Sequence, residues 1–191
     1  AYGCYNRVLS LVKKKEDASE EAHLERAERI CEAVKLWNRL DPEKKKPLRT
    51  SRSGNASHSV RTSNKEGSHT IYLGDLNSIL EISEEQMTIK LEPGVTVGQA
   101  TKALTAKGLQ LKATLEMEDA TIGGLVMATG MTTHSHICGL VCDTVLSYEL
   151  VTGKGELIRV TAENQHADLF RALPWSHGTL GFLTCLELQV V

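Results

Sequence analysis

Two adjacent glycines, Gly123 and Gly124, stand in a run of small and hydroxyl-bearing residues that extends from Thr121 to Thr133. A glycine permits a tight turn and lets another group approach the backbone closely, because no Cβ is in the way. Several backbone N–H groups that converge on one point form a binding site for an anion such as a pyrophosphate. The run therefore predicts either a phosphate-binding loop or a buried turn at which two elements pack closely, since both need such glycines.

The spacing of this run excludes two common nucleotide-binding loops. No Lys-Ser or Lys-Thr pair follows the glycines at the distance that a Walker loop requires. The Gly-x-Gly-x-x-Gly pattern of a dinucleotide-binding βαβ unit is absent as well. Two further glycine-bearing stretches, at 50–55 and 178–182, are candidates for the same binding site.

Hydrophobic periodicity predicts a mixture of helices and strands. The expected helices lie at 19–40, 97–107 and 168–173, and the expected strands at 70–73, 88–91, 144–151, 156–160 and 180–191. The turn Gly153-Lys154-Gly155 joins two of these strands in a predicted hairpin. Strands mixed with helices, without regular βα alternation, favour an α+β fold over a doubly wound α/β fold.

The predicted helix at 19–40 carries the signals of a well-defined element. Ser19 is a suitable N-cap, and Glu20 and Glu21 suit the positive end of the helix dipole. One apolar stripe at helical spacing comprises Ala27, Ile30, Cys31, Val34 and Trp37. Asp41-Pro42 ends the helix and a lysine run follows. We therefore expect an amino-terminal helical arm and linker at 1–48 and one domain at 49–191.

Charge and cysteine usage bound the function classes. The net charge of −2 provides no global field for nucleic acid. Residues 1–50 hold 12 basic and 9 acidic residues, which fits either a solvated helix face or contact with an anionic membrane surface. No stretch approaches the ~20 apolar residues of a membrane span. Five scattered cysteines predict reduced thiols, and the start at Ala1 suggests a piece of a longer protein.

One loop contains four residues of the types that bind zinc, namely His134, His136, Cys138 and Cys142. Structural zinc sites take two ligand pairs at defined spacing from two separate turns. These four residues come from a single loop and do not form Cys-x-x-Cys pairs. The sequence therefore predicts no metal site and favours a polar loop that borders a ligand.

Four ordered stretches, at 91–99, 121–133, 139–145 and 178–181, resemble the FAD-binding domain of the vanillyl-alcohol-oxidase and p-cresol-methylhydroxylase superfamily. The likeness extends from about residue 49 to the end of the chain. It implies a two-lobed FAD-binding domain of the p-cresol-methylhydroxylase type, in which the central glycine run wraps the FAD pyrophosphate. The cofactor-binding residues that it implies are Arg52, Ser53, Gly54, Thr121, Ile122, Gly123, Gly124, Leu125, Val126, Met127, Ala128, Thr129, Gly130, Met131, Thr132, Thr133, Gly178 and Gly181.

Several members of this superfamily attach FAD covalently to a histidine two residues after the glycine of the first loop. Ala56 occupies that position here, and His58 lies two residues further along. The resemblance therefore implies non-covalent FAD, with His58 as a surface loop residue.

Within the superfamily, the stretches 116–124 and 174–182 are most similar to the delta-24 sterol reductases. This likeness implies that NADPH reduces FAD, and that the reduced flavin then reduces a sterol side-chain double bond. It also implies a substrate lobe after residue 191, an anchor before Ala1 and attachment to the cytosolic face of the endoplasmic reticulum membrane. No catalytic residue is assigned in this chain, and its oligomeric state is open. Two alternatives remain: an FAD-dependent oxidase or dehydrogenase of an alcohol, lactone or hydroxy acid, and a non-catalytic flavin-binding module.

Overall fold

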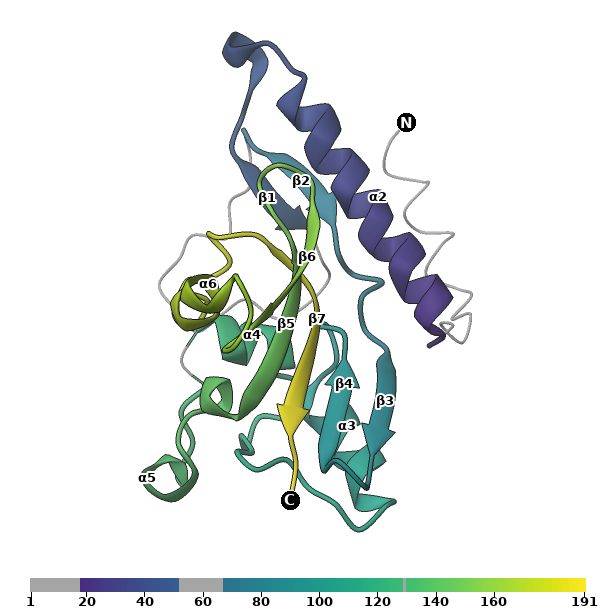
Figure 1. Cartoon of the computed structure of the whole chain (residues 1–191), viewed down its shortest axis with the longest axis vertical. Coiled ribbons are helices and arrows are strands. Elements are labelled where there is room, and N and C mark those ends of the chain that lie inside the picture. The colour runs from purple at the N-terminus through teal and green to yellow at the C-terminus, as the bar shows by residue number, and fades with distance from the viewer. Residues whose placement is uncertain (1–17, 52–66, 129) are drawn as a thin grey trace.

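The computed structural model describes residues 18–51, 67–128 and 130–191, and it combines helices and strands in an α+β fold (Figure 1). The helical elements are α2 (Glu20–Asn38), η1 (Pro42–Lys44), α3 (Val97–Thr105), α4 (Ile122–Met127), α5 (Ser135–Cys138), η2 (Val141–Thr144) and α6 (Ala167–Ala172). The strands are β1 (Leu48–Ser51), β2 (His69–Tyr72), β3 (Ile79–Ser83), β4 (Thr88–Leu91), β5 (Val145–Val151), β6 (Leu157–Thr161) and β7 (Phe182–Gln189).

The strands form two sheets. Strands β1 and β2 pair in parallel as a small two-stranded sheet. The other five strands form a sheet in the order β3-β4-β7-β5-β6, in which every neighbouring pair is antiparallel. The carboxy-terminal strand β7 is central, so it joins the β3–β4 hairpin to the β5–β6 hairpin. This arrangement explains why most residues of β7 are buried.

The main hydrophobic core lies between the five-stranded sheet and the helices α3, α4 and α6. Leu150, Leu186 and Leu188 on the strands are fully or almost fully buried in this core, as are Leu104 of α3 and Val126 of α4. A capping box at the start of α3 pairs Thr96 with Gln99, which fixes where that helix begins. The core therefore holds the first turn of α4 in a defined position beside the sheet.

Helix α2 packs outside this main core, along β2 and the β5–β6 hairpin (Figure 1). The side chain of Ser19 caps the helix by accepting a hydrogen bond from the N–H of Ala22. Its buried stripe, which includes Ile30 and Val34, packs against Ile71, Leu76 and Val151 in a second core. Within the described residues, the search for a helix with the length and apolarity of a membrane span finds none.

Most predicted elements agree with the structure to within two or three residues at each end. The predicted hairpin is β5–β6, and Gly108 ends the α3 region with a φ of 71°. Six elements were not predicted: the strands β1 and β3, the helices α4 and α5, and the short 3-10 helices η1 and η2. The glycine run at 121–133 was read as a loop, and that reading was wrong for 122–127, which form helix α4. The prediction of an α+β fold is confirmed.

Tyr148 places a polar atom in the core without a partner. Its side chain is 1% exposed, and its hydroxyl makes no hydrogen bond within the described part of the chain. Burial, with the nearby Cys142 and Asp143, raises the pKa of this phenol above its ordinary value. The ring packs edge-on against Phe170 with centroids 5.3 Å apart, and a phenylalanine would keep this contact.

Replacing Tyr148 with Phe is therefore expected to raise the free energy of unfolding by about 1 kcal/mol, because a buried hydroxyl without a partner costs stability. Urea unfolding followed by circular dichroism would measure the change. Phe170→Leu serves as the control, because it removes the ring contact and is expected to lower stability. A fall in stability for Tyr148→Phe would contradict the assignment of an unpartnered hydroxyl.

Candidate functional site

A cleft lies where the small sheet, the start of α4 and the start of β7 meet. Its volume is about 160 Å³, and its lining residues are Thr50, Leu73, Pro93, Gly94, Thr121, Gly123, Gly124, Met127, His177, Gly178, Gly181, Phe182 and Leu183. Five of these thirteen residues are glycines, so much of the wall is bare backbone. Because pockets for whole small ligands usually measure ~300–1,000 Å³, this cleft suits one part of a larger ligand.

The amino-terminal turn of α4 forms one wall of the cleft and is fixed to the turn that follows β4. The N–H of Ile122 donates to the carbonyl of Val95 at 2.8 Å, and the N–H of Gly123 donates to Pro93 at 3.0 Å. An added Cβ at Gly123 would overlap the side chain of Pro93 and lie 2.9 Å from its carbonyl oxygen. Gly123 therefore permits close packing, and its N–H is already used inside the protein.

Gly124 has a different role from its neighbour. It is exposed in the cleft wall, and an added Cβ there would meet only the side-chain oxygen of Thr121, at 2.9 Å. Within the described residues, the N–H of Gly124 has no hydrogen-bond partner. This N–H is therefore open to a ligand, and the absence of a side chain lets the ligand reach it.

The opposite wall comes from the loop before β7, which has unusual backbone geometry. Trp175 has a φ of 65° and His177 a φ of 51°, values that non-glycine residues rarely adopt. The N–H of His177 donates to the carbonyl of Met127 at 2.8 Å, which joins this loop to the end of α4. Backbone strain of this kind concentrates at functional sites, and here it lies directly beside the cleft.

The structure brings six of the predicted cofactor-binding residues together at the cleft: Thr121, Gly123, Gly124, Met127, Gly178 and Gly181. Ile122 and Val126 point into the core instead and are almost fully buried. Leu125 and Ala128 are half-buried and do not line the cleft. Arg52, Ser53, Gly54 and Thr129 lie outside the described residues, as does His58.

The end of the predicted run serves the fold rather than this cleft. Gly130 has a φ of 54°, and an added Cβ would lie 2.7 Å from the Cβ of Val141. The backbone N–H of Thr132 is bound by Ser135, and the hydroxyl of Thr133 donates to Glu116. Met131 is 70% exposed. Gly130, Met131, Thr132 and Thr133 do not line the cleft.

Seven lining residues were not among the predicted cofactor-binding residues: Thr50, Leu73, Pro93, Gly94, His177, Phe182 and Leu183. Thr50 and Phe182 do fall within the candidate stretches 50–55 and 178–182. Pro93 and Gly94 belong to a stretch that was recognised only as the turn before α3. Thr50 lies on β1 and Leu73 directly follows β2, so the pairing of these two strands, which are distant in the sequence, brings both residues to the cleft. No local pattern marks Leu73.

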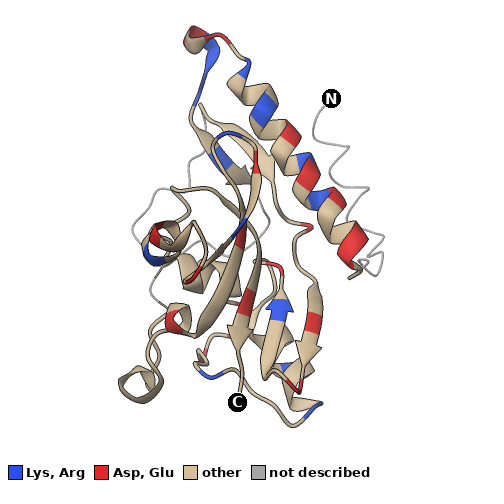
Figure 2. Ribbon diagram, in the orientation of Figure 1, with Lys and Arg blue, Asp and Glu red and all other residues tan. Residues whose placement is uncertain are grey.

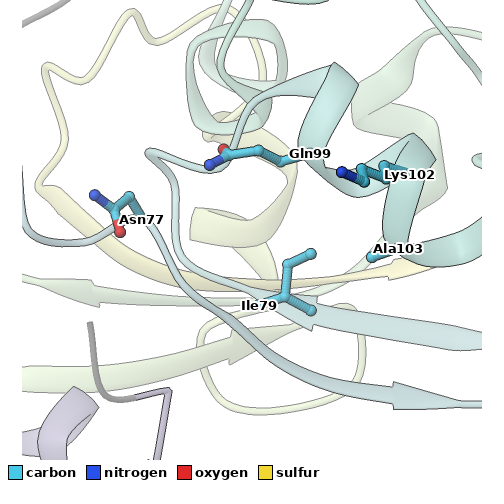
Figure 3. A pocket seen from close by; sticks show the side chains of 5 residues that line it. All are labelled: Asn77, Ile79, Gln99, Lys102 and Ala103. Atoms are coloured by element: carbon cyan, nitrogen blue, oxygen red, sulfur yellow. The ribbon is translucent and has the colours of Figure 1, made fainter. Parts of the chain in front are cut away.

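A larger hollow of about 480 Å³ lies between β3 and α3 and is lined by Asn77, Ile79, Gln99, Lys102 and Ala103 (Figure 3). Its two amides are already used by the fold. Gln99 accepts a hydrogen bond from the N–H of Thr96, and Asn77 donates to the carbonyl of Gly74. The hollow is wide open and contains no glycine, so the glycine-lined cleft is the better candidate site despite its smaller volume.

The histidines and cysteines of the loop 134–142 do not form a metal site within the described part of the chain. The thiol of Cys138 points to the carbonyl of His134 at 3.2 Å, and the thiol of Cys142 lies 3.9 Å from a carboxylate oxygen of Asp143. Burial, followed by the charge of Asp143, raises the pKa of the Cys142 thiol. The Cys142 thiol is therefore protonated at neutral pH.

Sequence comparisons give relatives along the whole chain. A Delta(24)-sterol reductase of Arabidopsis thaliana is 44% identical over 119 residues, which cover 62% of this chain and 21% of the relative. A Delta(24)-sterol reductase of Homo sapiens is 34% identical over 190 residues, which cover the whole chain and 36% of the relative. The chain thus spans about a third or less of the length of these relatives.

A solved structure and a family model agree with this result. The crystal structure of an oxidase of 6-hydroxy-D-nicotine from Arthrobacter nicotinovorans superposes with a TM-score of 0.72 at 21% identity, and covers 86% of this chain and 34% of that one. The model described as "FAD binding domain" matches residues 24–161. The bare backbone of the cleft, with the open N–H of Gly124, fits a diphosphate group. This chain belongs to the family of FAD-binding domains.

Proposed function

We propose that the full-length protein uses FAD and NADPH to reduce the delta-24 double bond in the side chain of a sterol. The names of the relatives support this proposal, because the likeness to one Delta(24)-sterol reductase extends over the whole chain at 34% identity. The described residues contribute the site of the FAD diphosphate. The observation that supports this role most is the open backbone of Gly124 in a cleft walled by glycines.

The residues of this chain bind and orient the cofactor. The N–H of Gly124 donates to a phosphate oxygen, and Gly178 and Gly181 let the opposite wall approach closely. Leu73, Met127, Phe182 and Leu183 line the same cleft and exclude water from the bound group. FAD supplies the redox chemistry, since its ring accepts and releases a hydride. We propose that FAD is held without a covalent bond, because Ala56 stands where several relatives carry a histidine.

The substrate and the location of the protein are parts of the same proposal. The sterol would bind to a lobe that follows this domain, and that lobe would supply the proton for the second carbon of the double bond. The excess of basic residues at 1–50 supports an orientation of this end toward the anionic cytosolic face of the endoplasmic reticulum membrane. Helix α2 itself carries both signs of charge along its length (Figure 2).

Anaerobic reduction of the full-length flavoprotein tests the proposed function. NADPH is expected to bleach the flavin absorbance, because hydride transfer yields the reduced ring. A sterol with a delta-24 double bond is then expected to restore the oxidised spectrum. The same sterol with a saturated side chain is the control and should leave the spectrum bleached.

Each alternative predicts a different result in this experiment. An oxidase or dehydrogenase would be reduced by an alcohol, lactone or hydroxy acid, and an oxidase would be reoxidised promptly by dioxygen. A non-catalytic module would bind FAD and remain oxidised with NADPH. If the delta-24 sterol leaves the reduced spectrum unchanged, the sterol reductase proposal fails.

A further inference from the structure

A buried cluster of charged side chains joins helix α2 to the body of the domain. It consists of His23 and Arg26 on α2, Glu92 after β4 and Glu149 on β5, and we name it the α2 clamp. The ring Nδ1 of His23 lies 2.8 Å from Glu92 Oε1, and its Nε2 lies 2.9 Å from Glu149 Oε1. Arg26 donates to Glu92 Oε1 through Nε at 3.0 Å and Nη2 at 2.8 Å. The side chains of His23 and Glu92 are 1% and 0% exposed.

Both ring nitrogens of His23 face carboxylate oxygens, which only accept hydrogen bonds. Burial by itself lowers the pKa of His23, but the hydrogen bonds and charges of Glu149 and Glu92 outweigh burial and raise the pKa to about 9. His23 is therefore a doubly protonated cation at neutral pH. With Arg26 it balances the two carboxylates.

Further polar groups lie around the α2 clamp. Thr184 on β7 donates to Glu149 Oε1 at 2.7 Å. Lys90 on β4 pairs with Glu20 at 2.9 Å and adds positive charge near Glu149. The Cys185 thiol is buried, and burial raises its pKa to about 12, so it stays neutral. The pKa of Lys90 is also raised above its ordinary 10.5, so neither Lys90 nor Cys185 changes charge between neutral pH and about pH 9, whereas His23 does.

Glu92 is the member of the clamp that reaches toward the cleft. Its second oxygen accepts a hydrogen bond from the N–H of Ser78 at 2.8 Å. Its own N–H donates to the carbonyl of Ser78, and its carbonyl accepts from the N–H of Val95. The side chain and backbone of Glu92 are thus both fixed, immediately before the Pro93-Gly94 turn.

The Pro93-Gly94 turn is part of the cleft wall. Both residues line the cleft. The carbonyl of Pro93 accepts a hydrogen bond from the N–H of Gly123. Gly123 directly precedes Gly124, whose N–H is open to a ligand. The N–H of Gly94 donates to the carbonyl of Leu76 at 2.7 Å, and an added Cβ at Gly94 would overlap that carbonyl. The turn is thus tightly packed, and through it the position of Glu92 is connected to the amino-terminal turn of α4 and the open N–H of Gly124.

We propose that His23 and Arg26 are positioning residues for the FAD diphosphate, which act by holding Glu92 and through it the Pro93-Gly94 turn and the start of α4. Neither residue lines the cleft. The proposal rests on the binding of FAD in the cleft and goes beyond it, because it couples cofactor affinity to helix α2. Loss of the His23 proton leaves two buried carboxylates around a neutral ring, so the affinity for FAD is expected to fall as the pH rises through about 9.

The test is a titration of the full-length apoprotein with FAD, followed by flavin fluorescence from about pH 7 to about pH 10. For the unmodified protein, the Kd for FAD is expected to rise roughly tenfold between these two pH values. A tenfold change in Kd is about what one charge-assisted hydrogen bond contributes. His23→Gln is expected to bind FAD roughly tenfold more weakly at pH 7 and to show no further change up to pH 10.

Matched variants separate positioning from a general loss of stability. His166→Gln removes a histidine whose side chain hydrogen-bonds only to Gln165 among the described residues, so it should keep the original affinity and pH profile. Arg26→Lys keeps the charge and is expected to retain most of the affinity that Arg26→Gln loses. Near-ultraviolet circular dichroism of each variant checks that the fold is intact at the pH of the titration.

Three outcomes would overturn the inference: a pH-independent Kd in the unmodified protein, an unchanged Kd in His23→Gln, or equal losses in Arg26→Lys and Arg26→Gln. The pH-independent Kd would be measured on the unmodified protein, so this outcome overturns the inference even if a substitution unfolds the protein. Failure of the sterol reaction leaves the inference intact, because the titration measures only the binding of FAD. A protein that binds no FAD at any pH overturns both the inference and the assignment of the cleft.

Discussion

Replacing Gly124 with Val is expected to weaken the binding of FAD by roughly 10- to 100-fold, because the new side chain fills space that the diphosphate needs and overpacking costs about 1–3 kcal/mol. The fold should persist. Valine forms helix at least as well as glycine, and the only described atom that the added Cβ approaches is the rotatable hydroxyl of Thr121. Cofactor loss and fold loss are thus separable at this position.

Two other glycines make the comparison decisive. Gly153→Val in the β5–β6 turn is the matched control, since no atom lies within 4 Å of an added Cβ there, and it should keep both cofactor and stability. Gly123→Ala should lower stability, because its Cβ would overlap Pro93. Flavin content after purification and the melting temperature of the apoprotein measure the two effects. Gly124→Val protein that keeps its yellow colour would show that the diphosphate lies elsewhere.

The different roles of these glycines explain what the sequence could predict. The glycines at 123, 124 and 130 indicate that some group approaches the backbone closely. The sequence does not show whether that group is a ligand or another part of the protein. For Gly124 the structure leaves the approach open to a ligand, whereas for Gly123 and Gly130 the approaching groups are Pro93 and Val141. The packing partner of Gly123 lies 30 positions away, and no local pattern reveals it.

Helix α4 illustrates the limit for secondary structure. Two glycines in six residues oppose helix formation in isolation, so the stretch looks like a loop. Burial of Ile122 and Val126, together with hydrogen bonds to Pro93 and Val95, overrides this local preference. By contrast, α2 and the β5–β6 hairpin carry caps, periodicity and turn residues that act locally, and the sequence predicted both.

The α2 clamp was missed for the same physical reason. The apolar stripe of α2 was recognised, but the sequence analysis did not single out His23. Its partners Glu92 and Glu149 lie 69 and 126 positions away, and only the folded sheet brings them together. A buried histidine between two carboxylates is a property of tertiary structure that single-sequence patterns do not encode.

Glu92→Gln is expected to lower the free energy of unfolding by about 3–5 kcal/mol, because removing one member of a buried ion cluster leaves the others uncompensated. The glutamine keeps the shape of the side chain, so the loss reports the missing charge. Urea unfolding at pH 7 measures it. Glu84→Gln is the matched control: Glu84 pairs with Lys107 at the surface and is 59% exposed, and surface ion pairs contribute little.

The pH dependence of the stability lost in Glu92→Gln shows whether a charged His23 causes the loss. The pKa of His23 is about 9 in the folded protein against an ordinary 6.5, so its contribution is complete below pH 6.5 and disappears as the pH rises through 9. The shift corresponds to about 3 kcal/mol at most. Glu92 also contributes to the raised pKa of Cys185, but that pKa is about 12 and lies above the pH range of this experiment. The gap in stability between the unmodified protein and Glu92→Gln should therefore narrow from about pH 7 to about pH 10, and a constant gap would exclude a charged His23 from the clamp.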